Sequence, residues 1–165
     1  MVLVSVPLLV ATVPARALAE SPLLNVEGMT FVASRGDENE LILHADRARF
    51  HTDEERVFLE TVHMVVEPSD FSGSFEIDCD EGQLDMATND FEARGNVRGT
   101  TDGGRSFSAP WVQYDHEKGL LFTNAPVLIN EDAITYRGGG FQYYVRTKRF
   151  RLLGGASVVQ EGQEP

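Results

Sequence analysis

The sequence predicts an all-β protein with one domain, and three observations support that prediction. Short runs rich in Val, Phe, Leu and Tyr alternate apolar and polar residues, as a sheet with one buried face requires. Gly, Asp, Asn and charged residues separate these runs about every 8–12 positions, which is the usual turn spacing of all-β domains. From Leu41 onward no convincing amphipathic helix interrupts the pattern. A chain of 165 residues is long enough for one core and too short for two.

The alternating runs align as four units of about 30 residues. The units are Leu41–Glu67, Phe75–Thr101, Ser106–Asp132 and Ile134–Gln160. Each unit has a small residue, a bulky apolar anchor five positions later, a polar turn, and a second apolar residue seven positions after the anchor. The anchors are Phe50, Leu84, Tyr114 and Tyr143, and the second apolar residues are Val57, Phe91, Leu121 and Phe150. Anchor spacings of 34, 30 and 29 residues indicate stacked supersecondary units.

One such unit cannot bury its own apolar sheet face. Stacked units can fold two half-sheets over one another, which predicts a jelly-roll-like channel lined with apolar side chains. The residues expected to point inward are Leu43, Ala45, Phe50, Val57, Leu59, Phe75, Ile77, Leu84, Phe91, Ala109, Tyr114, Val127, Phe141, Tyr143 and Phe150. These side chains either fill a closed core or line a groove for a ligand, and the pattern alone leaves both open.

The charge is strongly acidic and unevenly distributed. The formal net charge is −12, which argues against a nucleic-acid-binding protein, because phosphate contacts need a basic face. Residues 134–160 nevertheless carry five basic side chains and no acidic one. They form either a solvated strand face or a surface for an acidic partner or an anionic ligand. With Lys148, Arg149 and Arg151 near the C-terminal sheet edge, the last unit is expected to pair with another protein strand to strand.

The sequence offers little for catalysis or metal binding. The acidic residues lie in turns or on the outward phase of strands, and no serine or cysteine has a Gly-flanked nucleophile elbow. His44 and His51 each precede an aspartate by two positions, but solvated surface explains them better than a metal site. Cys79 is the single cysteine, so no internal disulfide can form, and its alternating context predicts a buried thiol. We expect no enzyme, no cofactor and no metal.

Residues 1–19 differ from the rest of the chain. Val2–Val13 is a twelve-residue apolar run, which spans about 18 Å as a helix and cannot cross a hydrocarbon core of about 30 Å. Ala17 and Ala19 are spaced like a signal-peptidase site. The segment therefore predicts a weak secretion signal or part of a longer membrane anchor, and both place the rest of the chain outside the cytoplasm. A buried first strand of a cytosolic domain is the remaining alternative.

Several motifs resemble the OstA-type repeat of lipopolysaccharide-transport proteins. They are "ADRARFHTDEERVFL" from Ala45, "EARGNV" from Glu92, "SAPWVQYDHEKGLLF" from Ser108 and the Gly-Gly-Gly-Phe of the last unit. Among these proteins the chain most resembles the LptC family, over residues 28–160. The resemblance implies a twisted, V-shaped β-jellyroll of stacked antiparallel strands from four repeats of about 30 residues. It also implies three segments: an N-terminal anchor or signal at 1–19, the jellyroll at 20–160 and a short tail at 161–165.

The same resemblance implies a non-catalytic bridge protein held at the inner membrane, with its domain in the periplasm. Such a protein accepts lipopolysaccharide from periplasmic jellyroll domains of the ABC transporter permease at its N-terminal edge and passes it to an LptA-like protein at its C-terminal edge. The acyl chains would lie in an apolar groove lined by Leu43, Phe50, Val57, Leu59, Ile77, Leu84, Phe91, Tyr114, Val127, Phe141, Tyr143 and Phe150. The partner interface would include Gly138, Gly139, Gly140, Lys148, Arg149 and Arg151. A soluble LptA-like bridge and a structural or adhesive β-repeat protein without a ligand are the alternatives.

Overall fold

The computed structural model describes residues 23–35, 38–67 and 73–160. Within these residues the chain forms β-strands and two short 3-10 turns, and it contains no α-helix, so the predicted all-β class is confirmed. The segment 1–19, expected as an anchor or signal, and the tail 161–165 lie outside the described residues. The strands are β1 (Leu23–Arg35), β2 (Glu38–His51), β3 (Arg56–Val66), β4 (Phe75–Asp85), β5 (Phe91–Thr101), β6 (Ser106–Asp115), β7 (Leu120–Thr123), β8 (Val127–Glu131), β9 (Ile134–Tyr144) and β10 (Arg149–Gln160), and the 3-10 turns are η1 (Thr52–Glu54) and η2 (Val145–Thr147).

The strands form one antiparallel sheet in the order β1-β2-β3-β4-β5-β6-β7-β9-β10. β7 and β8 are two pieces of one broken strand, because both pair with β6 on one side and with β9 on the other. β1 precedes the four predicted units and pairs with β2 along its whole length, from Leu23 opposite His51 to Arg35 opposite Glu38. Among the described strands, β1 and β10 are therefore the two edges of the sheet.

The positions that define the sequence repeat face one another across the hairpins. Phe50 lies opposite Val57, Leu84 opposite Phe91, Tyr114 opposite Leu121, and Tyr143 opposite Phe150. The residue five positions after each anchor adopts a left-handed backbone conformation; these residues are Glu55, Asn89, Gly119 and Lys148. The repeated turn geometry fixes the register of each hairpin, and this explains why the spacing persists while the side chains vary.

Every long strand is interrupted near its middle, and the interruptions form a line across the sheet. At each of these positions the regular pairing is broken, by a skipped pair, a bulge or, between β7 and β8, a gap in the strand. The positions are Gly28, Asp46, Thr61, Asp80, Gly95 with Asn96, Pro110, residues 124–126, Gly139, and Gly154 with Gly155. Gly28, Thr61, Gly95, Asn96, Gly154 and Gly155 also have positive φ angles. Pro110 is tolerated in a central strand because it lies at a bulge, where no ladder hydrogen bond is lost.

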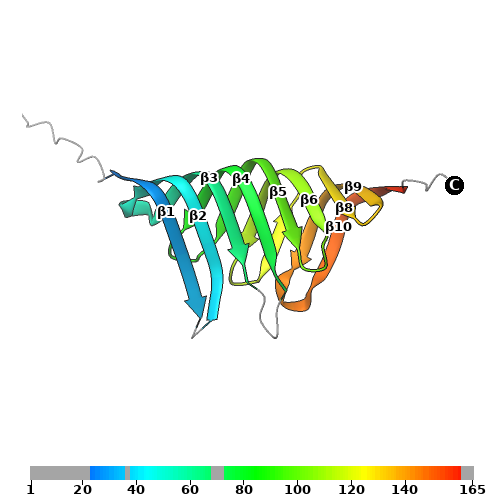
Figure 1. The fold of residues 1–165 in the computed structure, drawn as a ribbon, viewed down its shortest axis with the longest axis horizontal. Helices are drawn as coiled ribbons and strands as arrows, with labels where there is room; N and C mark the ends of the chain where they lie inside the picture. Colours follow the sequence, from blue (N-terminus) through cyan, green and yellow to red (C-terminus); the bar gives the residue numbers. More distant parts are fainter. Residues whose placement is uncertain (1–22, 36–37, 68–72, 161–165) are drawn as a thin grey trace, which may run out of the picture.

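The sheet folds along this line, and its two halves face each other as a twisted, V-shaped β-jellyroll (Figure 1). The strand ends then form two rims, which we name here. Rim A contains Gly73 and Ser74 before β4 and the β5–β6 and β8–β9 connections, and rim B contains the β2–β3, β4–β5, β6–β7 and β9–β10 turns. Two aromatic contacts join the halves through the core. Phe75 meets Tyr114 with ring centroids 5.0 Å apart, and Phe107 meets Phe141 at 4.9 Å.

The glycines of β9 sit where neighbouring backbone comes closest. A Cβ at Gly140 would lie 2.4 Å from the carbonyl oxygen of Thr123, and one at Gly138 would lie 2.5 Å from Cδ1 of Leu152. At Gly139 the nearest atom would be the Cα of Gly154, at 3.2 Å. Gly139 and Gly140 therefore lie against neighbouring backbone, and Gly138 lies against the Leu152 side chain.

Gly140→Ala is expected to lower the free energy of unfolding by about 2 kcal/mol or more, because its methyl group would overlap a buried carbonyl oxygen that cannot move alone. Gly139→Ala is the matched control and should cost less than about 1 kcal/mol, since its neighbour needs to shift by only a few tenths of an ångström. Urea denaturation of both purified variants measures the difference. Equal midpoints for the two variants would contradict the packing described for Gly140.

Candidate functional site

The groove residues expected from the sequence all face the interior of the jellyroll. Of these twelve, all except Phe50 and Phe150 are buried, and those two are half-buried against the same core. The other expected inward residues, Ala45, Phe75 and Ala109, are buried as well. The predicted inward phase of the strands is therefore confirmed, whereas a role in lipid binding stays a prediction.

The interior is a packed core rather than an open groove. Leu43, Val57, Ile77 and Leu84 have no exposed surface, and Tyr143 is 1% exposed. The rings of Phe75 and Tyr114 and of Phe107 and Phe141 span the space between the two half-sheets. A ligand in this interior would have to separate the halves or displace side chains.

Other core residues were not predicted from the sequence, because the four units were aligned on anchors that lie near rim B. The strand halves toward rim A also contribute apolar side chains to the core, in the same inward phase. The missed residues include Leu41, Met64, Val66, Val97, Phe107 and Ile129. Continuing the two-residue period through the interrupted positions would have found some of them, but each bulge changes the phase by one residue.

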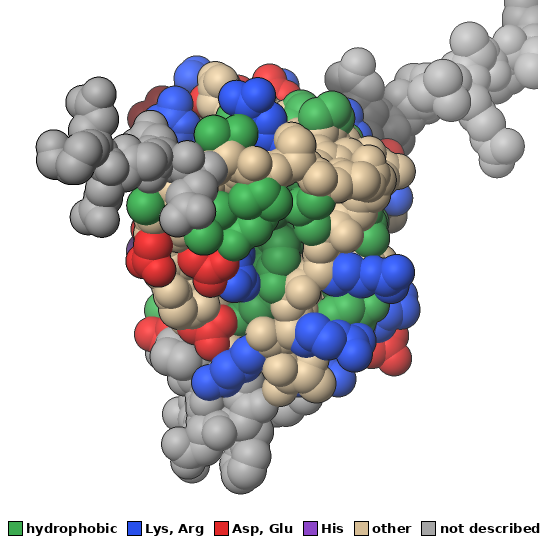
Figure 2. Space-filling view, turned by 90° about the vertical axis from the view of Figure 1, so that its right-hand side faces the viewer, with side chains coloured by type: hydrophobic (Ala, Val, Ile, Leu, Met, Phe, Trp, Pro, Cys, Tyr) green, Lys and Arg blue, Asp and Glu red, His purple; other side chains and the backbone are tan. Residues whose placement is uncertain are grey.

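The core is open at the edge strand β10. Inward residues of this strand have no further strand to cover them, and Val158, opposite Tyr136, is 58% exposed. A crevice of about 220 Å³ lies here, lined by Arg105, Ile129, Glu131, Tyr136, Phe150 and Leu152. The Arg105 guanidinium lies 4.9 Å from the centroid of the Phe150 ring and 2.6 Å from a Glu131 carboxylate oxygen. Figure 2 shows this end as a hollowed apolar surface with Lys and Arg side chains along one side.

The opposite edge, β1, is also apolar on its inner side. Leu24 lies opposite Phe50 in the inward phase and is 56% exposed. Val26, Phe31 and Ala33 follow in the same strand and are partly buried against the core. The apolar interior thus reaches both edges of the sheet.

The residues expected at the partner interface fall into two groups. Gly138, Gly139 and Gly140 lie in β9, one strand in from the edge, and contact their own chain. Lys148, Arg149 and Arg151 are exposed at the start of β10. Arg149 stacks over Tyr144 at 4.7 Å, and Lys148 lies 3.7 Å from Asp102. Within the described residues the outer edge of β10 pairs with no other strand.

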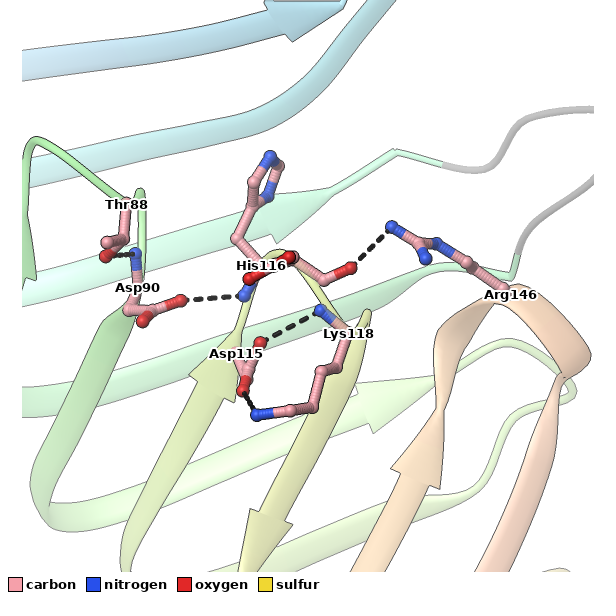
Figure 3. A network of polar contacts seen from close by, with 7 residues as sticks. Thr88, Asp90, Asp115, His116, Lys118 and Arg146 are labelled. Atoms are coloured by element: carbon pink, nitrogen blue, oxygen red, sulfur yellow. Dashed lines mark hydrogen bonds and ion pairs between the residues drawn. The ribbon is translucent and has the colours of Figure 1, made fainter.

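Hydrogen bonds tie each rim B turn to the next. Met86 N–H donates to the carbonyl of Glu55 at 2.8 Å, and His116 N–H donates to the Asp90 carboxylate at 2.9 Å. Arg146 then donates to the carbonyl of Glu117 at 2.7 Å (Figure 3). Rim B is therefore a connected row of turns rather than a set of separate loops.

Several groups on rim B have shifted pKa values, among them Asp115 and Tyr143. Burial opposes ionisation of Asp115, but the Lys118 ammonium and backbone N–H outweigh it and lower the pKa of this carboxyl. Burial and the hydrogen bond to Asp102 raise the pKa of the Tyr143 phenol. Tyr143 therefore stays a neutral hydrogen-bond donor at physiological pH.

In the described part of the chain, the structure brings together one group of potential metal ligands, and it does not include the two His-x-Asp pairs of the sequence. His44 is exposed, and neither it nor His51 joins a cluster of potential ligands among the described residues. Instead, ligand atoms of His63, Glu76 and Asp78 lie within 4.8 Å of one another on the outer face. His63 Nδ1 is 2.9 Å from the Asp78 carboxylate, so these two side chains already bond to each other. Chain spacing could not reveal this group, because strand pairing brings it together.

A family model described as "Lipopolysaccharide-assembly, LptC-related" matches residues 42–161. The chain belongs to the LptC family. The match begins in β2 and includes every later strand, so the jellyroll apart from β1 carries the family signature. The sequence matches none of the curated proteins with which it was compared.

Among solved structures, the chain is similar to LptH of Pseudomonas aeruginosa, described as the LptA-homologous periplasmic component of the conserved lipopolysaccharide transport device. The two share 7% identity with a TM-score of 0.35, over 86% of this chain and 96% of that chain. Membership of the LptC family connects the chain with lipopolysaccharide transport. In the part of the chain that the structure describes, no helix is long and apolar enough to cross a bilayer.

Cys79 provides a reporter of the closed core. The side chain is buried, and burial raises the pKa of its thiol to about 12. At pH 8 the native protein is therefore expected to react with a maleimide far more slowly than the urea-unfolded protein, by about a hundredfold or more, because the thiolate is the nucleophile. Mass spectrometry of timed samples measures both rates. Labelling of the native protein as fast as the unfolded one would show that the half-sheets separate freely.

Proposed function

We propose that the chain is a non-catalytic bridge that accepts lipopolysaccharide from the inner-membrane ABC transporter and passes it to a periplasmic LptA-like protein. One observation carries this proposal: an apolar interior reaches two sheet edges of the same chain, at β1 and β10. Jellyrolls placed edge to edge would join such interiors into one apolar path. Family membership supports lipopolysaccharide as the molecule carried.

Acyl chains would supply the binding energy. Each buried methylene contributes about 0.8 kcal/mol, so a few acyl chains suffice for stable binding. The chain has a net charge of −12 and would repel rather than hold the phosphates of the lipid head group. We therefore assign the interior to the acyl chains, with the sugar and phosphate groups in solvent at the rims.

The two edges would have different partners. At the β1 edge we place the periplasmic jellyroll domains of the transporter permease, and at the β10 edge the LptA-like protein. The exposed Arg149 and Arg151 lie at the start of β10, where they would orient an incoming strand. This arrangement places the jellyroll in the periplasm, with residues 1–19 toward the inner membrane.

A packed interior would also suit a structural β-repeat protein without a ligand. The exposed apolar residues at both edges, Leu24 and Val158, fit that alternative less well, because a ligand-free core gains nothing from open ends. Membership of a lipopolysaccharide-assembly family favours the carrier.

Photoreactive benzoylphenylalanine at Phe50 or Phe150 is expected to crosslink to lipopolysaccharide in cells, because both side chains are half-buried on the inner face. The matched control is Phe58, which is also half-buried but lies on the outer face against His51, with ring centroids 5.0 Å apart. Immunoblotting for lipopolysaccharide on the purified adducts measures crosslinking. Equal adducts at Phe58 and Phe50 would exclude an interior path.

The double variant Arg149→Glu, Arg151→Glu is expected to weaken binding of a purified LptA-like protein about tenfold, mainly through slower association, because rim charges steer docking. The control is Arg94→Glu, Arg98→Glu, which makes the same change in net charge on exposed residues of β5. Biolayer interferometry gives both rate constants. If the β5 variant weakens binding equally, net charge rather than the β10 edge determines the affinity.

A further inference from the structure

Contacts between the two rims bear on how acyl chains could reach the closed core. The inference drawn from them rests on the proposed function. Rim A and rim B meet where the connections before β4 and after β5 approach the β9–β10 turn. There, Gly73 N–H donates a hydrogen bond to the carbonyl of Val145 at 2.8 Å. The Tyr143 hydroxyl donates to the Asp102 carboxylate, and the Lys148 ammonium lies 3.7 Å from the same carboxylate.

These five residues, Gly73, Asp102, Tyr143, Val145 and Lys148, form what we call the seam latch. Gly73 and Asp102 belong to rim A, whereas Tyr143, Val145 and Lys148 belong to rim B. Asp102 N–H also donates to the carbonyl of Ser74 at 3.0 Å, so the two rim A segments are joined to each other. The latch therefore connects two rows of turns and not two isolated loops.

The latch fits tightly around the Tyr143 hydroxyl. A Cβ at Gly73 would lie 2.4 Å from that oxygen and 2.9 Å from the Asp102 carboxylate, so only glycine leaves room for the contact. Tyr143 occupies the anchor position of the last unit. The anchors of the first two units are Phe50 and Leu84, which have no hydroxyl group to form such a bond.

Directly inside the latch lie the aromatic contacts that fill the interior. Phe150 packs near Tyr143 with centroids 6.2 Å apart and stacks on Phe141 at 5.2 Å, while Phe107 meets Phe141 from the opposite half. Opening the latch would allow the halves to separate at these rings without breaking any strand pairing. The polar groups of the rims could then form hydrogen bonds with water. If strand pairing broke instead, backbone N–H and C=O groups would be left without partners in the core.

We propose that the seam latch is a reversible lateral gate, and that acyl chains enter the core sideways between rim A and rim B when it opens. The head group would remain outside the gate throughout. The alternative route is threading along the axis from an open sheet edge, for which the latch need not open.

A cleavable bridge across the latch tests the route. In the variant Asp102→Cys, Lys148→Cys both positions are accessible, because the native side chains are 25% and 56% exposed. A short bis-maleimide with a disulfide in its spacer joins the two rims, while buried Cys79 does not compete. The probe is purified rough-type lipopolysaccharide, and its co-elution with the protein is followed over time.

The bridged protein is expected to load at least about tenfold more slowly than the unbridged double variant, and a reductant should restore the rate. Each single-cysteine variant treated with the same reagent controls for modification alone. Loading of the bridged protein at the unbridged rate would overturn the lateral gate, with the proposed function intact. If the wild-type protein takes up no lipopolysaccharide at all, the proposed function itself fails.

Loosening the latch is expected to have the opposite effect. Tyr143→Phe keeps the ring in the core and removes the hydroxyl, so loading should become about threefold or more faster than in the wild type. Tyr144→Phe is the matched control, since the Tyr144 hydroxyl bonds to the side chain of Gln142 beside it, at 3.4 Å. A thermal melt identifies any general loss of stability. Gly73→Ala is a second opening variant, because its methyl group would push the Tyr143 hydroxyl away from Asp102. Wild-type loading rates in both opening variants would also overturn the inference.

Discussion

The line of interruptions across the strands is the constraint on which the rest of the molecule depends. Long antiparallel strands with one apolar face would otherwise form an open sheet with that face in water. Gly28, Pro110 and Gly139 lie on the line, at points where the chain can lose a ladder bond or bend sharply. Folding along this line brings the two apolar half-faces together, and it also places the described turns in two rims on the side opposite the bend.

This geometry separates the polar groups of the protein from its apolar side chains. Ladder hydrogen bonds satisfy the backbone, the interior holds apolar side chains, and the rims hold the reversible polar contacts. A bilayer lipid has the same division, with acyl chains that need shelter and a head group that needs water. A jellyroll with polar rims and two open edges therefore suits a carrier in a lipopolysaccharide pathway better than a reaction centre, and the family match points to the same pathway.

Acidic and basic side chains are distributed unevenly over the molecule. Most of the acidic residues lie in turns or on the outer faces of strands, and among the described residues none is buried in the core. The last unit carries five basic side chains and no acidic one, and within it Lys148 contacts Asp102 and Arg149 covers the Tyr144 ring. Arg105, from the β5–β6 connection, contacts Glu131 beside the same edge. The C-terminal edge thus combines basic side chains with an apolar interior that no further described strand covers.

The sequence by itself determined the fold class, the hairpin spacing and the inward phase of the strands, because alternation and turn residues are local signals. Phe50 and Val57, or Tyr143 and Phe150, could be paired from their spacing alone, since a hairpin turn of fixed length sets the register. The tertiary structure alone decided that the apolar face is closed, and that Phe107 meets Phe141 from the opposite half. It also decided that Tyr143 bonds to Asp102, 41 residues earlier in the chain. Such contacts depend on where the sheet bends and how far it twists, and bulges that shift the phase by one residue leave no periodic trace in the sequence.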